Sequence, residues 1–305
     1  MPTTVRVIPR LDIKGPNLIK GIQFDGHRVL GTAEQFADYY YREGADELIY
    51  QDAVASLYQR NSLTEIVRRT ASRIFIPLTV AGGIRSVEDV RELLRAGADK
   101  VAINTAATKR PELLSEIAKE FGSQCVVSSI EAFHKPDGRY EVWVDYGREP
   151  TGFDVFDWAR RVVDLGVGEI LLTSIHRDGM GRGFDLELTR RVSGSVPVPV
   201  IASGGAGDLH HFVDAVRIGA ADAVAAASVF HYHYAAPTDR PFMSYGEAQL
   251  RMGADIDSGN IDFLNHGYGR QRAIPVQSTS IAAVKNVMAA NGIQVRRAVE
   301  TAVPA

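Results

Sequence analysis

Short apolar runs alternate with amphipathic stretches along most of the chain. The apolar runs are five to nine residues long and are rich in Val and Ile. They lack the regular alternation of apolar and polar residues that is typical of a sheet with one face exposed to solvent. Such runs are typical of parallel strands that are covered on both sides. We predict eight strands, at residues 5–13, 48–53, 76–80, 100–104, 125–131, 169–175, 198–203 and 223–228.

The stretches between these runs have helical periodicity. In residues 87–95, Val87, Val90 and Leu94 recur at spacings of three and four, which places them on one face of a helix. Residues 153–165 follow the same kind of pattern, and we expect the last helix at residues 278–291. Strands that alternate with helices predict an α/β fold with a parallel sheet.

The second half of this pattern repeats the first at a fixed offset. IPLTVAGGI at residues 76–84 returns as VPVIASGGA at residues 198–206, and GADELI at 44–49 returns as GVGEIL at 166–171, both 122 residues later. Two halves of four strands each complete a (β/α)8 (TIM) barrel with a two-fold internal repeat, which is the fold we predict. An open, doubly wound sheet is the alternative.

Composition and charge narrow the class of protein. The chain has 305 residues, of which 45% are apolar and 23% charged, and a net charge of −3. We expect a single barrel domain over residues 1–305, and the charge gives no reason to expect nucleic acid or a membrane as a partner. Cys125 is the only cysteine, and no stretch is apolar enough for a signal or a membrane span, which predicts a cytoplasmic protein.

Two regions do not follow the regular alternation of strands and helices that the barrel requires. Residues 132–150 predict a hairpin excursion, with turn residues Pro136-Asp137-Gly138 and an alternating strand at 140–146. Residues 235–276 are poorly periodic, and we interpret them as an insertion before the last helix. His231 and His233 lack further ligands at metal-site spacing, so we expect neither a metal nor a cofactor.

The repeated glycine pairs follow strands 76–80 and 198–203. In a barrel of this type, functional groups lie at the carboxyl ends of the strands, and glycine lets backbone N–H groups approach an anion closely. Small or polar residues also follow the next strand in each half. We therefore predict two opposed phosphate sites, for a substrate with a phosphate at each end, from Gly83, Asn104, Thr105, Gly205, Ala227 and Ser228.

Two acids fall between the expected phosphate sites. Asp12 ends the first strand and Glu131 ends the fifth, and these strands lie opposite each other in an eight-stranded barrel. Two carboxyl groups that face one substrate can divide the roles of general acid and general base. Asp178 and Gly179 offer a contact for a sugar hydroxyl, and Lys20, on the long first loop, could reach a phosphate.

Four charged residues begin strands at the opposite end of the barrel: Arg6, Glu47, Lys100 and Glu169. Buried charges are costly unless they are paired, and two cations with two anions can pair around the axis. The quartet is either a structural network that plugs the bottom or a gated entrance to a channel through the barrel.

These residues carry a resemblance to a known family. The chain resembles the cyclase subunits of imidazole glycerol phosphate synthase (HisF) over about residues 5–231, and again over about 278–296. The motifs that carry the resemblance are RLDIK, GADELIYQD, VAGGIRS, GADKVAINTAA, FGSQCVVSSIEA, GEILLTSIHRDGMGRGFD and IASGGAGDLHHF.

The resemblance implies an amidotransferase with an ammonia channel, active in histidine biosynthesis. A glutaminase partner (HisH-like) at the barrel bottom hydrolyses glutamine, and ammonia passes through the barrel. At the mouth, ammonia reacts with a bis-phosphorylated ribotide, and this lyase reaction gives imidazole glycerol phosphate and AICAR. The family's first catalytic aspartate falls on Asp12, and an acidic residue of the partner surface falls on Asp99. The family's substrate contacts fall on the substrate-site residues named above, and its ammonia gate falls on the charged quartet.

The departures from the family pattern leave alternatives open. Glu131 stands where the family has its second catalytic aspartate, the first loop is altered, and residues 235–276 have no counterpart in the common form. Some sequence motifs are closer to those of paralogues encoded in gene clusters for surface polysaccharides. These are thought to channel ammonia from a glutaminase to a separate sugar amidotransferase, with little cyclase activity. A scaffold that only activates a glutaminase is a third possibility.

Overall fold

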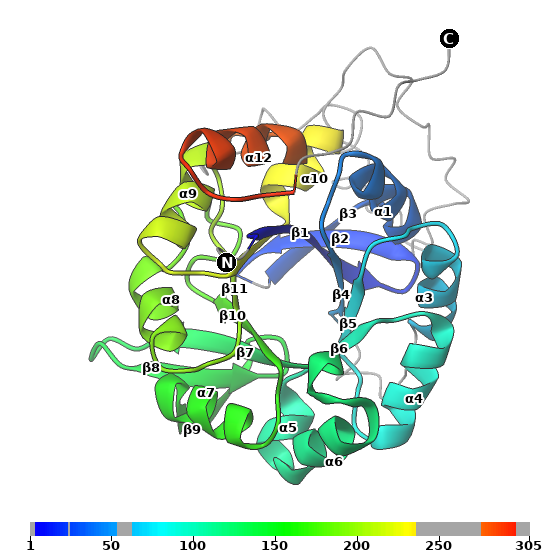
Figure 1. Ribbon diagram of the computed structural model, residues 1–305, viewed down its shortest axis with the longest axis vertical. Helices are drawn as coiled ribbons and strands as arrows, with labels where there is room; N and C mark the ends of the chain where they lie inside the picture. The colour runs from blue at the N-terminus through cyan, green and yellow to red at the C-terminus, as the bar shows by residue number, and fades with distance from the viewer. Residues whose placement is uncertain (1–3, 24, 54–62, 236–275, 297–305) are drawn as a thin grey trace.

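Eight parallel strands close into a barrel (Figure 1). The computed structural model describes residues 4–23, 25–53, 63–235 and 276–296. The barrel strands, in order around the ring, are β1 (Arg6–Lys14), β4 (Leu48–Asp52), β5 (Leu78–Ala81), β6 (Lys100–Ile103), β7 (Val126–His134), β10 (Glu169–Ser174), β11 (Val200–Ser203) and β12 (Ala223–Ala226). Parallel pairing of β12 with β1, and of β7 with β10, closes the ring. The (β/α)8 barrel is confirmed, and the open sheet is wrong.

Helices cover the outside of the barrel (Figure 1). They are α1 (Ala33–Arg42), α3 (Thr64–Ala71), α4 (Val87–Ala96), α5 (Thr105–Lys109), α6 (Glu112–Phe121), α7 (Val155–Asp164), α8 (Leu186–Ser193), α9 (Leu209–Arg217), α10 (Ser228–Ala235) and α12 (Ile281–Ala290), with a 3-10 turn at Ser123–Cys125. Helix α4 shows why the sequence folds this way. Ser86 and Asp89 form a capping box at its start, Gly97 ends it in a left-handed conformation, and its apolar face packs on the barrel.

The core has an outer and an inner layer. The outer layer fills the space between strands and helices. The inner layer lies inside the ring of strands and consists of Ile8, Ile49, Ala81, Ala102, Val127, Leu171, Ile201, Ala223 and Ala225. Four of these nine residues are alanine, so the middle of the barrel is apolar and is lined in part by the smallest side chain that has a Cβ.

Two antiparallel hairpins extend from the carboxyl ends of the barrel strands. After β1, strands β2 (Asn17–Ile22) and β3 (Asp25–Thr32) pair with each other, and β2 also pairs with β1. The expectation of a long first loop is wrong here, because residues 17–22 continue the β1 sheet. The hairpin expected at 132–150 is formed by β7, β8 (Tyr140–Val144) and β9 (Glu149–Asp154), so the expected strand 140–146 ends two residues early.

The expected insertion at 235–276 lies, apart from its two end residues, outside the described residues. The single domain over residues 1–305 therefore stays a prediction. Of the helices in the described part of the chain, none has the length and apolar character that crossing a membrane requires.

Candidate active site

The repeated glycine turns occupy equivalent places in the two halves. Gly82 after β5 and Gly204 after β11 have φ values of 94° and 89°. A Cβ on Gly82 would lie 2.6 Å from the carbonyl oxygen of Asp52, and one on Gly204 would lie 2.8 Å from that of Ser174. Asp52 and Ser174 are themselves related by the offset of 122 residues. Both turns therefore need glycine for the same reason, a close approach to the preceding strand end.

A pocket of about 460 Å³ opens beside the first glycine turn. Of the expected site residues, Gly83, Asn104, Thr105 and Glu131 line it. Sequence reasoning missed the cationic side chains of Arg85, Lys109 and Arg110, which also line this pocket. These cations and the glycine backbone suit an anionic ligand, and four acids, Asp52, Glu131, Asp145 and Glu149, also line the pocket.

Part of the hydrogen-bonding capacity of this first pocket is used by the β8–β9 hairpin. Asn104 Nδ2 donates to the carbonyl oxygen of Trp143 at 3.2 Å, and Thr105 Oγ1 accepts from the N–H of Asp145 at 3.1 Å. The hairpin thus forms one wall of the pocket, which the sequence did not indicate.

A second, much smaller pocket lies at the other glycine turn. Its lining includes Lys20, Asp178, Gly179, Gly205, Ala227 and Ser228. The structure therefore sorts the expected ligand contacts into two groups, one at each glycine turn. At about 20 Å³ this pocket has room for about one water molecule, so a phosphate could enter only if the side chains around it shifted.

Lys20 is buried between two acids. Its Nζ atom lies 3.0 Å from Asp178 Oδ1 and 3.7 Å from Asp12 Oδ2. Burial alone would lower the pKa of Lys20, but the charges of Asp178 and Asp12 more than offset this, and the pKa is raised. Lys20 is therefore a fixed cation that ties the β2 hairpin to the loop after β10.

Arg10 is a second buried cation that sequence reasoning did not assign. Its Nε donates to Asp12 Oδ1 at 3.1 Å, and its Nη1 donates to Thr173 Oγ1 at 3.2 Å. Burial opposes its charge, but the nearby acids, Asp12 first, raise its pKa. The two-residue period of β1, which places Arg6, Arg10 and Asp12 on one strand face, was the signal that could have found it.

Glu131, within β7, lies in a different environment. The side chain is 3% exposed, and Oε2 accepts from the N–H of Gly147 at 2.7 Å. Burial raises the pKa of Glu131 to about 7, although Arg10 and the Gly147 N–H act in the opposite direction. Asp12, by contrast, pairs with two cations, which favour its charged form. One acid is thus suited to hold a proton at neutral pH and the other to accept one.

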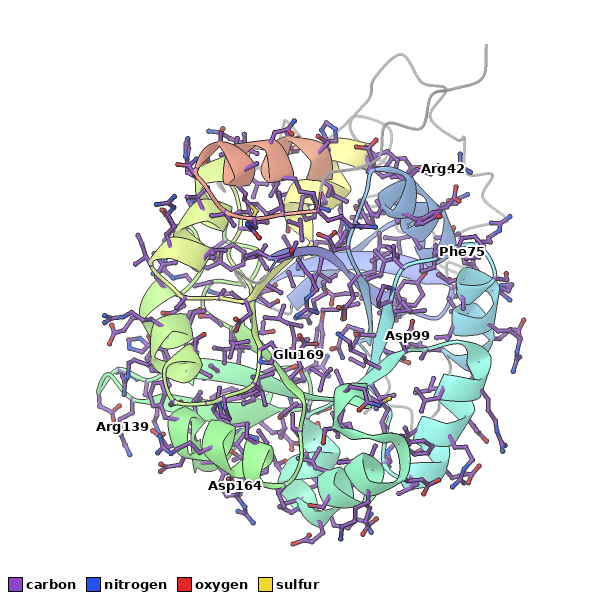
Figure 2. The ribbon with its side chains drawn as sticks, in the orientation of Figure 1. Arg42, Phe75, Asp99, Arg139, Asp164 and Glu169 are labelled. Carbon is purple, nitrogen blue, oxygen red and sulfur yellow. The ribbon has the colours of Figure 1, made fainter. Side chains whose placement is uncertain are left out.

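The four charged residues at the strand starts form a closed ring. Glu47 contacts Arg6 at 2.6 Å and Lys100 at 3.0 Å, and Glu169 contacts Lys100 at 2.8 Å and also pairs with Arg6. Burial opposes the charge of Arg6, but both glutamates offset this and raise its pKa. In Figure 2, Glu169 lies near the middle of the ring of helices. The quartet closes the bottom of the barrel with no net charge.

Asp99, the expected partner contact, is exposed close to this ring (Figure 2). Its Oδ2 accepts from the backbone N–H of Leu78 at 2.8 Å. The carboxylate therefore also holds the start of β5 beside β6, which is a structural role.

His231 is a core residue. It is fully buried, its Nδ1 lies 2.6 Å from the hydroxyl of Tyr40, and burial lowers its pKa to about 3. In the part of the chain that the structure describes, no three His, Cys, Asp or Glu side chains are arranged to hold a metal ion.

A closed barrel with buried acids and cations at the carboxyl ends of its strands has the architecture typical of (β/α)8-barrel enzymes. Comparison with known proteins narrows the class. Residues 6–235 match the family model described as "Histidine biosynthesis protein". The chain is also 63% identical to the imidazole glycerol phosphate synthase subunit HisF of Legionella pneumophila, over 210 residues that cover 69% of this chain and 99% of that protein. The chain belongs to the HisF family of histidine biosynthesis proteins.

Proposed function

We propose that the chain is the ammonia-accepting cyclase subunit of an imidazole glycerol phosphate synthase. In this reaction, ammonia attacks phosphoribulosyl-formimino aminoimidazole carboxamide ribotide at the barrel mouth, and the products are imidazole glycerol phosphate and AICAR. The observation that carries the proposal is the 63% identity to a HisF subunit, joined to a mouth with two glycine turns and two unlike acids.

The residues at the two glycine turns suit a substrate with a phosphate at each end, and the second pocket must widen to admit one. The first offers Gly83, Thr105 and the cations Arg85 and Lys109, and the second offers Gly205, Ser228 and the ammonium group of Lys20. Backbone N–H groups and fixed cations are the groups that bind phosphate most readily in proteins.

The acids fit a reaction that needs a base and an acid together. Asp12, paired with Arg10 and Lys20, accepts a proton, and Glu131 donates one. We assign these roles from the two environments, because a carboxyl group with a pKa near 7 works as an acid at neutral pH.

The lower half of the barrel fits the passage of ammonia. The Arg6–Glu47–Lys100–Glu169 ring lies at the entrance, and an apolar layer that contains Ala81, Ala102 and Ala225 lies above it. A neutral molecule the size of ammonia crosses an apolar layer at far lower cost than an ammonium ion does. Opening of the ring would admit ammonia from below.

We infer a HisH-like glutaminase as the partner at the bottom face. Asp99 and Phe75 are exposed close to the strand starts. Phe75 is 80% exposed, the highest value among the exposed large apolar side chains of the described residues. Aromatic side chains of this kind are frequent anchors of protein interfaces. We further propose that the complex acts in the cytoplasm.

The alternative, a subunit that feeds ammonia to a separate sugar amidotransferase, is not favoured. The relative that is 63% identical is named as an imidazole glycerol phosphate synthase subunit. Purified protein supplied with the ribotide and an ammonium salt should form imidazole glycerol phosphate and AICAR in equal amounts. Absence of turnover, together with stimulation of a cognate glutaminase, would overturn the proposal in favour of an ammonia-delivering subunit.

A further inference from the structure

The turn between β8 and β9 has an unusual backbone. Asp145, Tyr146 and Gly147 have successive φ values of 54°, 57° and 70°. Two of the three residues carry a Cβ, for which this left-handed conformation is unfavourable. Residues persist in such conformations where their surroundings hold them, often beside a functional site. The contacts of the turn show what holds it.

Two backbone hydrogen bonds fasten the turn to the expected active site. The N–H of Asp145 donates to Thr105 Oγ1 at 3.1 Å, and that of Gly147 donates to Glu131 Oε2 at 2.7 Å. Tyr146 lies between these two bonds. Its position is therefore set by one side chain of the first phosphate pocket and by one of the two acids.

Tyr146 is buried at the barrel mouth. The side chain is 7% exposed and packs in a small apolar cluster with Ile19 on β2, Ala53 after β4 and Ile175 after β10. Strands β4 and β10 lie on opposite sides of the eight-stranded ring. Tyr146 thus belongs to a cluster that draws on residues from both sides of the mouth.

The phenol also lies between the two pockets. Tyr146 lines the first pocket, and its hydroxyl lies within electrostatic range of Asp178, which lines the second. It also interacts with the charges of Asp12, Arg10 and Glu131. The hydroxyl is thus surrounded by the groups to which we assign proton transfer.

Burial and nearby charges determine the protonation state of this hydroxyl. Burial, then the negative charge of Asp12, raises the pKa of Tyr146 well above its ordinary value, and only Arg10 opposes the shift. The shift therefore favours the protonated form of the hydroxyl at neutral pH. A phenol of this kind is a hydrogen-bond donor and a poor source of protons.

We propose that Tyr146 contacts the substrate between its two phosphate groups and donates a hydrogen bond from its phenol to that part of the molecule. The inference rests on the proposed function, because only a ligand that reaches both pockets must pass this side chain. No proton is transferred and no bond is made or broken by Tyr146. Its hydrogen bond orients the substrate between Asp12 and Glu131.

The test compares Tyr146→Phe and Tyr146→Ala with the wild-type protein and with Tyr140→Phe as a matched control. Tyr140 lies on the same hairpin, but its hydroxyl donates to the Asp185 carboxylate at 3.2 Å, outside the two pockets. Turnover of the ribotide is measured with saturating ammonium salt, so that no glutaminase is required. The dissociation constant of the ribotide is measured separately by calorimetry.

We expect kcat/KM and affinity for the ribotide to fall roughly tenfold in Tyr146→Phe, the effect of about one hydrogen bond, and further in Tyr146→Ala. Tyr140→Phe should match the wild type in both, and the thermal midpoint of Tyr146→Phe should stay close to the wild-type value. Wild-type kcat/KM and affinity in Tyr146→Phe would overturn the inference.

The two measurements separate this inference from the proposed function. If the wild-type protein binds the ribotide but does not convert it, the cyclase proposal fails, while the affinity of Tyr146→Phe still decides the role of Tyr146. If the wild-type protein does not bind the ribotide at all, both proposals are wrong.

Discussion

Glu131 Oε2 accepts a hydrogen bond from the backbone N–H of Gly147 at 2.7 Å. The bond joins β7 to the turn between β8 and β9. It shows how the barrel accommodates a glutamate at a position where the family has an aspartate. The extra methylene carries the carboxylate to the hairpin backbone. The hairpin thus fixes the longer side chain in one place.

Replacement of Glu131 should change how stability depends on pH. The folded-state pKa of about 7 lies above the ordinary value of 4.5, so the stability that Glu131 contributes is fully present below pH 4.5 and is lost as pH rises through 7. In the wild-type protein this decrease in the free energy of unfolding amounts to about 3 kcal/mol, and we expect Glu131→Gln not to show it. Urea unfolding of both proteins between pH 4.5 and 8.5 measures the difference, and parallel curves would contradict the assignment.

Turnover should also depend on the protonation of Glu131. If Glu131 donates a proton, ammonia-dependent turnover in the wild-type protein should fall as pH rises above about 7 at a constant concentration of free ammonia. Glu131→Gln should lose most turnover at every pH. An acid limb near 7 instead, with activity rising as pH increases, would show that Glu131 acts as the base.

Removal of the Lys20 charge should impair substrate binding and destabilise the mouth. In Lys20→Met, Asp178 and Asp12 lose a buried cation, so we expect a loss of about 3 kcal/mol of unfolding free energy and a marked rise in KM for the ribotide. Lys14, exposed at the end of the same sheet, provides the control Lys14→Met, which should leave both quantities unchanged. A Lys20→Met protein with wild-type KM would show that the ammonium group does not touch the substrate.

The ring at the bottom should matter for glutamine and not for free ammonia. Arg6→Ala removes the cation that joins Glu47 and Glu169. In the complex with a glutaminase, we expect glutamine-dependent turnover to fall much more than turnover with excess ammonium salt. Arg68→Ala, which breaks an exposed ion pair on α3, should affect neither. Equal losses with both nitrogen sources would assign the ring a purely structural role.

His231 should make the protein sensitive to acid. Its folded-state pKa of about 3 lies below the ordinary value of 6.5, so the stability it contributes is fully present above pH 6.5 and is lost as pH falls toward 3. The His231→Gln protein can still form a hydrogen bond to Tyr40. Between pH 6.5 and pH 4, we expect its free energy of unfolding to decrease by about 3 kcal/mol less than that of the wild type. Circular dichroism melts over this range measure it, and an unchanged acid sensitivity would contradict the prediction.

The barrel could be predicted because its signal is repeated. The offset of 122 residues relates the glycine turns, and in the structure it also relates the backbone atoms that require those glycines, at Asp52 and Ser174. The charged quartet could be found because each member begins a strand. These features depend on position along a strand, which apolar runs and turn residues mark directly.

Other parts of the site depend on contacts that periodicity does not encode. Lys20 lies on a strand because residues 17–19 pair with the end of β1 and the rest of β2 pairs with β3. The altered first loop gave no strand signal that could be read alone. Arg10 and Tyr146 were missed for a related reason. Each is a polar side chain buried by partners from distant segments, and a sequence pattern read locally assigns such residues to solvent or to a turn.

The most direct measurement is a crystal structure of Glu131→Gln with the ribotide bound. Density for one phosphate at the Gly82-Gly83 turn near Thr105, for the other at the Gly204-Gly205 turn near Ser228, and for the middle of the ligand beside Asp12 is the result we expect. A ribotide with a single phosphate held, or bound away from both glycine turns, would contradict a site that holds the substrate at both ends.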